Sequence, residues 1–330
     1  MNKSLSLICF GLVISSCSLF CKESNAQTIK NEQLDTPVEV SSFEKCKISV
    51  DKATNAWRRY YDRMDTDDTN DRARYNLSVC DFGLDFTDVI NSCQQPAEEG
   101  NAEAQFYVGY ASASDYCKKP DFVNAKVWLE KSADQNFPHA LSYLGDLYTS
   151  EKKENNKVII KCDTKQYIEY FSKSAMQNEL DGIKGLAMHY NNEHNYSKAV
   201  EYYKKAYELG DAKSAWKLGD LEIILNNNIN KALNWYEKAG ELTSDLQYTN
   251  DIARIYEKGE FKVFFFDRKN NFTEKTLNIK QNKEKAKQFY KLSCSAIKNN
   301  NGNKVFGILP ISQGKKYSNF ACKQYKLINN

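Results

Sequence analysis

One cluster of potential metal ligands stands out in the sequence, namely His189, Glu193 and His194. His189 and Glu193 are four residues apart. On a helix, this spacing would put His189 and Glu193 on one face, where they could hold a zinc ion. His189, however, stands at a position that is apolar in the repeated segments described below. We therefore expect a packed, hydrogen-bonded histidine there and no metal.

An acidic segment, with Asp65, Asp67 and Asp71, has the spacing that begins a calcium-binding loop. It lacks the central glycine of such loops, and its twelfth position holds Asn76 where a bidentate glutamate is required. The sequence thus predicts no calcium site, and no cofactor is expected.

A Ser-x-x-Lys pattern, which supplies the nucleophile of some acyl-transferring enzymes, occurs four times. The pairs are Ser42/Lys45, Ser150/Lys153, Ser295/Lys298 and Ser312/Lys315. No Lys-Thr-Gly or Ser-Asp-Asn motif accompanies them, and such matches arise freely in a chain rich in Ser and Lys. We therefore predict no catalytic residues and no enzyme activity.

The composition describes an ordinary core and a nearly neutral surface. Apolar residues make up 41% of the 330 residues, and the few turn-forming residues, 14 Gly and 5 Pro, argue against a β-sandwich or barrel. The 46 basic and 43 acidic residues leave a net charge of +3, with no long basic block. A nucleic-acid partner is therefore not expected.

The N-terminus has the pattern of an export signal, because Lys3 precedes an apolar run over 5–16 that is too short to span a bilayer. Two cleavage sites compete. A lipobox would end the signal at residue 16 and make Cys17 the lipidated first residue, whereas ordinary cleavage would remove 1–26. Both predict an exported, periplasmic chain, and the favoured lipobox predicts membrane contact only through a lipid anchor.

Five segments share one helical pattern, in which a small or aromatic residue is followed three and four places later by two large apolar residues. Ser or Ala stands at the seventh place of each. The leading residues are Ala125, Tyr167, Ala199, Ala232 and Ala286. Apolar residues at this spacing form one stripe on a helix, and their recurrence predicts an α-solenoid.

A second helical signature precedes each of these segments, most clearly where Ala140 is followed by Leu144-Gly145 and Tyr148. The glycine recurs in three copies, at Gly109, Gly145 and Gly219. A mid-helix glycine costs about 1 kcal/mol relative to alanine, so its recurrence indicates that a partner helix packs closely there. Asn136, Asn178 and Gly210 stand where the second helices should end, as left-handed caps.

Together the two signatures resemble the Sel1-like repeat, a relative of the tetratricopeptide repeat. The resemblance covers roughly 85–298 and implies an all-α solenoid of about five helix-turn-helix repeats over 99–298. We expect insertions at 150–163 and 260–282. A tether (17–44) and a helical N-terminal cap with a degenerate half repeat (45–98) would precede the array, and a tail (299–330) would follow it.

The cysteines favour disulfides, the default pairing in an oxidising compartment. Cys117 and Cys162 both fall between the two helices of successive copies, so we expect them to pair. Cys294 and Cys322 would pin the tail to the last helix. Cys80 would pair with Cys93 or with Cys46.

Two surfaces are candidates for binding a partner. First helices usually line the concave side of such arrays, and the variable positions there are Tyr107, Tyr110, Tyr143, Asp146, Lys217, Asp220, Asp251 and Arg254. The second is the 260–282 insertion, with Phe261, Phe264, Phe265 and Phe266, which we predict to form a small β-hairpin near 261–280 or a protruding loop.

The function expected from these features is non-catalytic binding of another protein in a bacterial envelope. The family resemblance makes an immunity protein, which neutralises an effector delivered into the periplasm, one form of this function. A general envelope scaffold or regulator without a toxin partner is the alternative. A β-lactam-binding or hydrolysing enzyme is the alternative from a different class, because some Sel1-like proteins have been linked to that chemistry.

Overall fold

The computed structural model describes residues 40–64, 86–115, 119–242, 246–266, 272–299 and 311–329, all within one compact unit, Val40–Asn330. The predicted export signal, Cys17, the acidic segment at 65–71, Cys80 and Cys117 lie outside the described residues. Among the helices that are described, none combines the length and the apolar character needed to cross a membrane.

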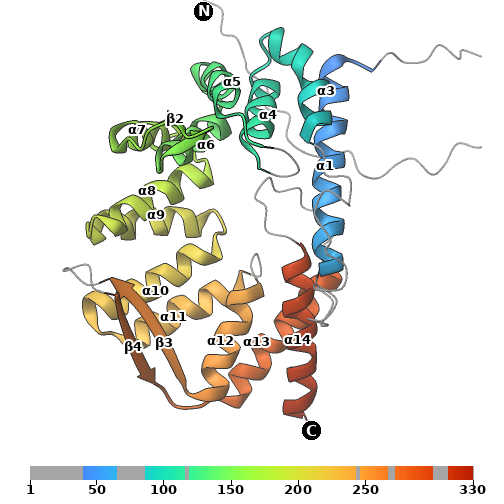
Figure 1. The fold of residues 1–330 in the computed structure, drawn as a ribbon. Helices are drawn as coiled ribbons and strands as arrows, with labels where there is room; N and C mark the ends of the chain where they lie inside the picture. Colours follow the sequence, from blue (N-terminus) through green and yellow to red (C-terminus); the bar gives the residue numbers. More distant parts are fainter. Residues whose placement is uncertain are drawn as a thin grey trace, which may run out of the picture. The chain divides into compact units, whose positions relative to one another are not determined.

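The body of the chain is an array of helix pairs, as predicted (Figure 1). The pairs are α4 (Ala102–Ala113) with α5 (Phe122–Asp134), α6 (Pro138–Tyr148) with α7 (Thr164–Ala175), α8 (Leu180–Asn192) with α9 (Tyr196–Glu208), α10 (Ala212–Asn226) with α11 (Ile229–Glu241), and α12 (Leu246–Lys258) with α13 (Lys283–Asn299). Each helix packs on the next along the chain, and the first helices α4, α6 and α8 also contact one another in turn. The fold is therefore an α-solenoid.

Local capping explains where these helices begin and end. Side chains at several starts, such as Asn101, Asp121 and Asp211, accept a hydrogen bond from the backbone N–H three residues later. Asn136 and Asn178, which follow second helices, have φ values of 58° and 57°. Both are the left-handed caps predicted from the sequence.

The recurring glycines in the first helices make room for large side chains of the second helices, as predicted. A Cβ on Gly145 would lie 2.5 Å from the ring of Phe171, and one on Gly219 would lie 2.4 Å from the ring of Tyr236. Phe171 and Tyr236 stand at the same place of their second helices, and both are buried. The glycines therefore set how closely each pair of helices packs.

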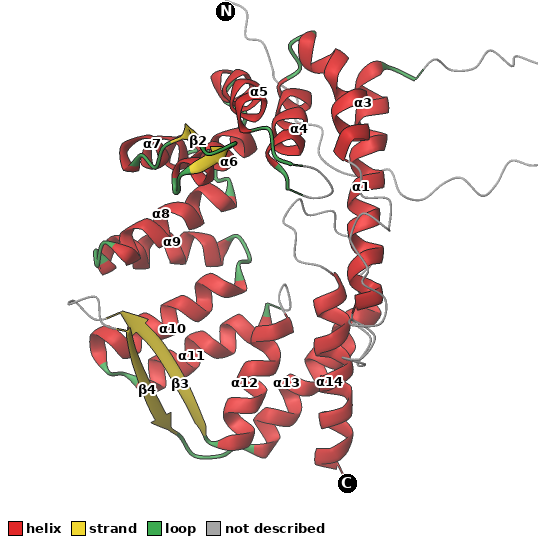
Figure 2. Ribbon diagram, viewed as in Figure 1, coloured by secondary structure: helices red, strands yellow, loops and turns green. Residues whose placement is uncertain are grey.

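The 260–282 insertion forms the predicted β-hairpin, made of β3 (Glu260–Phe266) and β4 (Phe272–Asn278), which pair antiparallel (Figure 2). One face is buried, with Phe261 and Val263 on β3 and Leu277 on β4. The 150–163 insertion also contains a hairpin, β1 (Lys152–Glu154) with β2 (Lys157–Ile160), although the sequence predicted no strands there.

Helices at both ends of the unit complete the packing. Before the array, α1 (Ser42–Met64) and α3 (Phe86–Glu98) pack together and are joined by the Cys46–Cys93 disulfide. After it, the tail contains α14 (Ile311–Asn329), which contacts α13, α12 and α1. The Cys294–Cys322 disulfide joins α14 to α13, as predicted.

Candidate functional site

An aromatic cluster lies where α3, α4 and α6 meet, and it is the candidate binding site. Its members are Phe86, Phe106, Tyr107, Tyr110, Phe137, His139 and Tyr143. The rings of Tyr110 and Tyr143, on the neighbouring helices α4 and α6, have centroids 5.0 Å apart. The ring of Phe106 lies 5.6 Å from that of Phe137 and 5.9 Å from that of His139.

The cluster has a buried base and a partly exposed rim. Phe86, Phe106 and Tyr107 are 6%, 7% and 9% exposed, whereas Tyr110 and Tyr143 are only half-buried. Aromatic residues that are held in place by a packed base and remain partly open to solvent are frequent centres of protein interfaces. The rim tyrosines are therefore the part of the cluster that a partner would contact.

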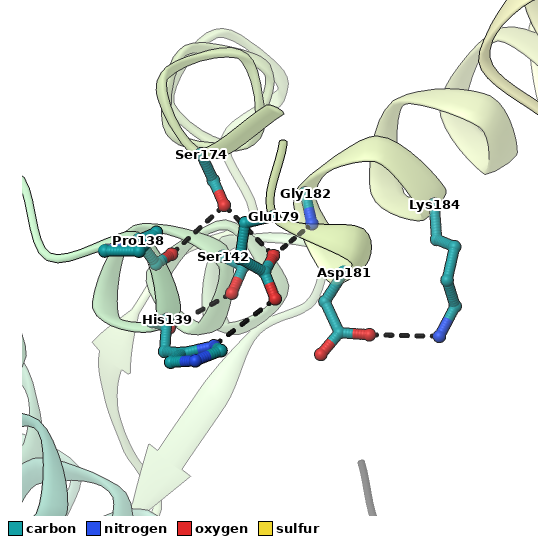
Figure 3. A network of polar contacts seen from close by, with 8 residues as sticks. All are labelled: Pro138, His139, Ser142, Ser174, Glu179, Asp181, Gly182 and Lys184. Carbon is teal, nitrogen blue, oxygen red and sulfur yellow. Dashed lines mark hydrogen bonds and ion pairs between the residues drawn. The ribbon is translucent and has the colours of Figure 1, made fainter. Parts of the chain in front are cut away.

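Next to His139 of the cluster, Glu179 forms a polar junction between two copies of the repeat (Figure 3). Its carboxylate accepts hydrogen bonds from the backbone N–H of Gly182 at 2.8 Å and from the hydroxyl of Ser174 at 3.1 Å. Nδ1 of His139, on α6, lies 3.3 Å from the other carboxylate oxygen. Glu179 thus caps α8 and at the same time orients the imidazole of His139 in the aromatic cluster.

The charges of this pair stabilise each other. The contact with Glu179 raises the pKa of His139 above its ordinary value, although partial burial opposes the charge. Burial opposes ionisation of Glu179 as well. The hydrogen bonds from His139 and from the backbone of Gly182 outweigh that effect, and they hold the pKa of Glu179 below its ordinary value.

Two of the predicted first-helix residues, Asp220 and Tyr107, are buried instead of lying on an open surface. Asp220 is 8% exposed and accepts a hydrogen bond from the hydroxyl of Tyr236 at 2.9 Å. Lys217, half-buried, donates to the other oxygen of Asp220 at 2.9 Å. The close approach of Tyr236 over Gly219 brings its hydroxyl to Asp220, so the prediction that Asp220 lies on a binding surface is wrong. Tyr107 is likewise buried, and its hydroxyl donates to Glu103.

Arg254, one of the two predicted residues of α12, contacts the tail of the chain. The guanidinium of Arg254 lies 5.3 Å from the ring centroid of Phe320 on α14, and it lies 3.9 Å from the carboxylate of Asp251. The side chain of Arg254 remains exposed. Of the eight predicted positions, the structure thus brings Tyr110 and Tyr143 together with the buried Tyr107, and Asp146 lies three residues after Tyr143 on α6.

The phenylalanines of the β3–β4 hairpin divide between the core and the surface. Phe261 is 8% exposed and packs edge-to-face on Tyr236, with centroids 5.6 Å apart, and Phe265 is half-buried. Phe264 is 48% exposed and stacks on Phe272. The side chain of Phe266 lies outside the described residues. Phe264 is therefore the most exposed of the three predicted residues whose side chains are described.

Two of the predicted cysteine pairings are wrong. Cys162 is a free, exposed thiol whose Sγ lies 3.4 Å from the carbonyl oxygen of Thr149, so it does not pair with Cys117. Cys93 is bonded to Cys46, so neither can pair with Cys80. The insertion hairpin between α6 and α7 determines where Cys162 lies, and the sequence pattern did not reveal this hairpin.

The histidine singled out from the sequence is packed and hydrogen-bonded. Nδ1 of His189 lies 2.7 Å from the hydroxyl of Tyr167, and the two rings meet edge-to-face. Nδ1 of His194 lies 2.8 Å from the hydroxyl of Tyr196. The residues of the candidate site that the sequence analysis missed are His139 and Glu179. Glu179 stands at the N-cap position that Asn101 and Asp211 hold in other copies.

Comparisons with known proteins agree with this fold. Residues 102–137, 186–211, 213–244 and 276–296 match the family model of the Sel1 repeat. A helical repeat scaffold is therefore the class of protein that the fold defines. Within that class, four segments of the chain are Sel1 repeats. No curated protein matches the sequence significantly.

Several solved structures resemble the chain at low sequence identity. A protective antigen with this repeat fold, present in uropathogenic Escherichia coli strains, is 20% identical with a TM-score of 0.49, over 88% of this chain and 56% of that one. A Sel1 repeat protein from Oxalobacter formigenes is 21% identical with a TM-score of 0.48, over 72% and 94%. An immunity protein from Pseudomonas aeruginosa is 13% identical with a TM-score of 0.39, over 74% and 75%.

Proposed function

We propose that this Sel1 repeat protein is a non-catalytic scaffold that binds another protein through the aromatic cluster of α4 and α6. The observation that carries the proposal is the contact between Tyr110 and Tyr143, two half-buried rings held over the buried Phe106. Large rings with little conformational freedom contribute strongly to binding when a partner covers them. The packing against Phe106 restricts both tyrosines before any partner arrives.

Site-specific cross-linking tests this proposal directly. A photo-activated amino acid placed at Tyr143 in the full chain, in cells that make it naturally, should form an adduct with a second protein. The matched control is Val127, which is 46% exposed on the second helix α5 and should form no such adduct. The proposal is wrong if irradiation at Tyr143 yields no protein adduct, or yields the same adducts as at Val127.

The finer form of the proposal is an immunity protein of the bacterial envelope, whose partner is an effector delivered into the periplasm. The export signal expected from the sequence supports this form, because it would bring the chain to the compartment where such effectors arrive. Cells that lack the chain should be inhibited by sibling cells that carry it. The wild-type chain should restore growth, and a variant with Tyr110→Ala and Tyr143→Ala should not. Normal growth without the chain would favour the general envelope scaffold.

A further inference from the structure

Carboxylates surround the aromatic cluster on the first helices. Glu103 lies one turn before Tyr107 on α4 and accepts a hydrogen bond from its hydroxyl at 2.7 Å. Asp146 follows Tyr143 on α6, and Asp181 begins α8 beside the Glu179 junction (Figure 3). Asp181 and Glu103 both act electrostatically on His139, and Asp181 also acts on Asp146, so these groups share one region of the surface.

Two of these carboxylates have no cation in ion-pair contact. Glu179 pairs with His139, and Asp181 pairs with Lys184 at 3.0 Å. Within the residues that the structure describes, Glu103 and Asp146 make no ion pair. Lys152 acts on Asp146 only from farther away, and its ammonium group donates to Ser150 at 2.9 Å. Counting Lys152, four carboxylates face at most three cations among the described residues, so the described part of this region has an excess of negative charge.

Asp146 shows the electrostatic consequence of this arrangement. Desolvation of its carboxyl group raises its pKa above the ordinary value, although the residue as a whole is exposed; Lys152 opposes this effect, and the nearby charge of Asp181 adds to it. A carboxylate that has lost part of its hydration without gaining a partner interacts more strongly with an incoming cation than a fully hydrated one does. Asp146 follows the half-buried Tyr143 by three residues on α6.

We propose that the aromatic cluster receives a cationic side chain, arginine or lysine, from a basic segment of the protein that binds there. The cation would lie over the rings of Tyr110 and Tyr143 and would pair with the carboxylate of Asp146. Rings attract cations through their electron-rich faces, and a guanidinium forms directed hydrogen bonds with a carboxylate at the same time. The excess of carboxylates favours a basic segment over an acidic one. This inference rests on the proposed binding function and adds the chemistry of the partner.

A pair of peptides tests the charge requirement on the full chain. One carries two arginines in a Gly/Ser/Leu background, and the other carries neutral citrulline in place of both. Each is titrated while the imidazole NMR signals of His139 are followed. The arginine peptide should shift these signals saturably, with a Kd lower than that of the citrulline peptide by about fivefold or more. The Asp146→Asn variant should raise that Kd by about threefold or more. The Asp134→Asn variant, altered at an exposed aspartate on α5, should not.

The outcomes separate this inference from the proposed function. Equal affinity for the two peptides, no binding by either, or indifference to Asp146→Asn would overturn the cationic partner. Cross-linking at Tyr143 tests the binding function independently of the charge of the partner. If the cross-linked partner segment lacks lysine and arginine, the binding function stands and the cationic partner is rejected.

Discussion

The carboxylate of Glu179 and Nδ1 of His139 lie 3.3 Å apart, and the two residues belong to successive copies of the repeat. The contact therefore joins α6 to α8 as well as orienting His139 among the rings. In this protein a polar pair supplements the apolar packing between copies, and it lies next to the proposed binding surface.

The Glu179→Gln substitution should weaken this junction. Gln keeps the size of the side chain but loses the charge that His139 and the N-terminus of α8 stabilise. We expect the free energy of unfolding to fall by about 1–3 kcal/mol, because the site is buried. In addition, the pKa of His139 should move back toward its ordinary value in an NMR titration. Glu208→Gln, at an exposed site on α9, is the control and should change neither quantity.

The pH dependence of stability should show both members of the pair. The folded pKa of His139 is raised above the ordinary 6.5, so its contribution is complete below that value and is lost as pH rises through the raised pKa. The folded pKa of Glu179 is lowered below 4.5, so its contribution is present above 4.5 and is lost as pH falls through the lowered pKa.

Urea unfolding as a function of pH measures these contributions. Relative to wild type, the His139→Gln variant should lose stability at pH 5–6 and lose less as pH rises above the His139 pKa. A loss that stays constant across this range would show that His139 contributes through packing alone.

The close packing over Gly219 predicts a sharp response to a single methyl group. In Gly219→Ala the new Cβ would lie 2.4 Å from the ring of Tyr236, a fully buried side chain whose hydroxyl is bonded to Asp220. We expect a loss of about 1–3 kcal/mol in chemical denaturation, since overpacking displaces neighbours. Lys213→Ala, at an exposed site on the same helix, should stay close to wild type. A Gly219→Ala variant as stable as the control would contradict this packing.

Among the described cysteines, only the one with a free thiol should react with an alkylating reagent. Without reductant or denaturant, an alkylating reagent should label Cys162 and leave Cys46, Cys93, Cys294 and Cys322 intact.

Replacing Cys294 and Cys322 by serine should lower the free energy of unfolding by about 2–4 kcal/mol. Hydrogen exchange should become faster in α14 first. Unchanged protection of α14 would show that its packing on α12, α13 and α1 suffices without the bond.

The β3–β4 hairpin offers a matched pair of substitutions three residues apart on one strand. Phe261→Ala should cost about 3–5 kcal/mol in unfolding free energy, because Phe261 fills the core beside Tyr236. Phe264→Ala removes an exposed ring and should change stability by less than about 0.5 kcal/mol. Equal losses for the two variants would mean that the hairpin does not pack on Tyr236 of α11 through its buried face.

The helix pairs could be predicted from the sequence because each is specified locally. The spacing of apolar residues, the glycine that accepts a ring and the Asn or Gly cap all lie within a few tens of residues. The burial of Asp220 could not be read in this way, since it depends on where the hydroxyl of Tyr236 arrives. The same holds for Cys162, whose place is fixed by the β1–β2 hairpin.

The candidate binding site was predicted only in part. Tyr110 and Tyr143 could be predicted because they stand at positions that vary between the copies, next to packing positions that recur in them. His139 carries no repeated signature, and its contact with Glu179 joins residues 40 positions apart along the chain. An acidic residue at Glu179, three places before the N–H of Gly182, was a readable capping signal. Its second role toward His139 depends on how two copies pack.

The contact between α14 and α1 has a consequence for how this protein can change in evolution. An array with free ends can gain or lose a repeat by gene duplication, because the added unit only moves the end outward. Here the helices before and after the array touch each other, so an extra repeat would separate surfaces that now meet. The number of repeats is thereby constrained, and diversification should proceed through loops and insertions between helices, as in the two hairpins.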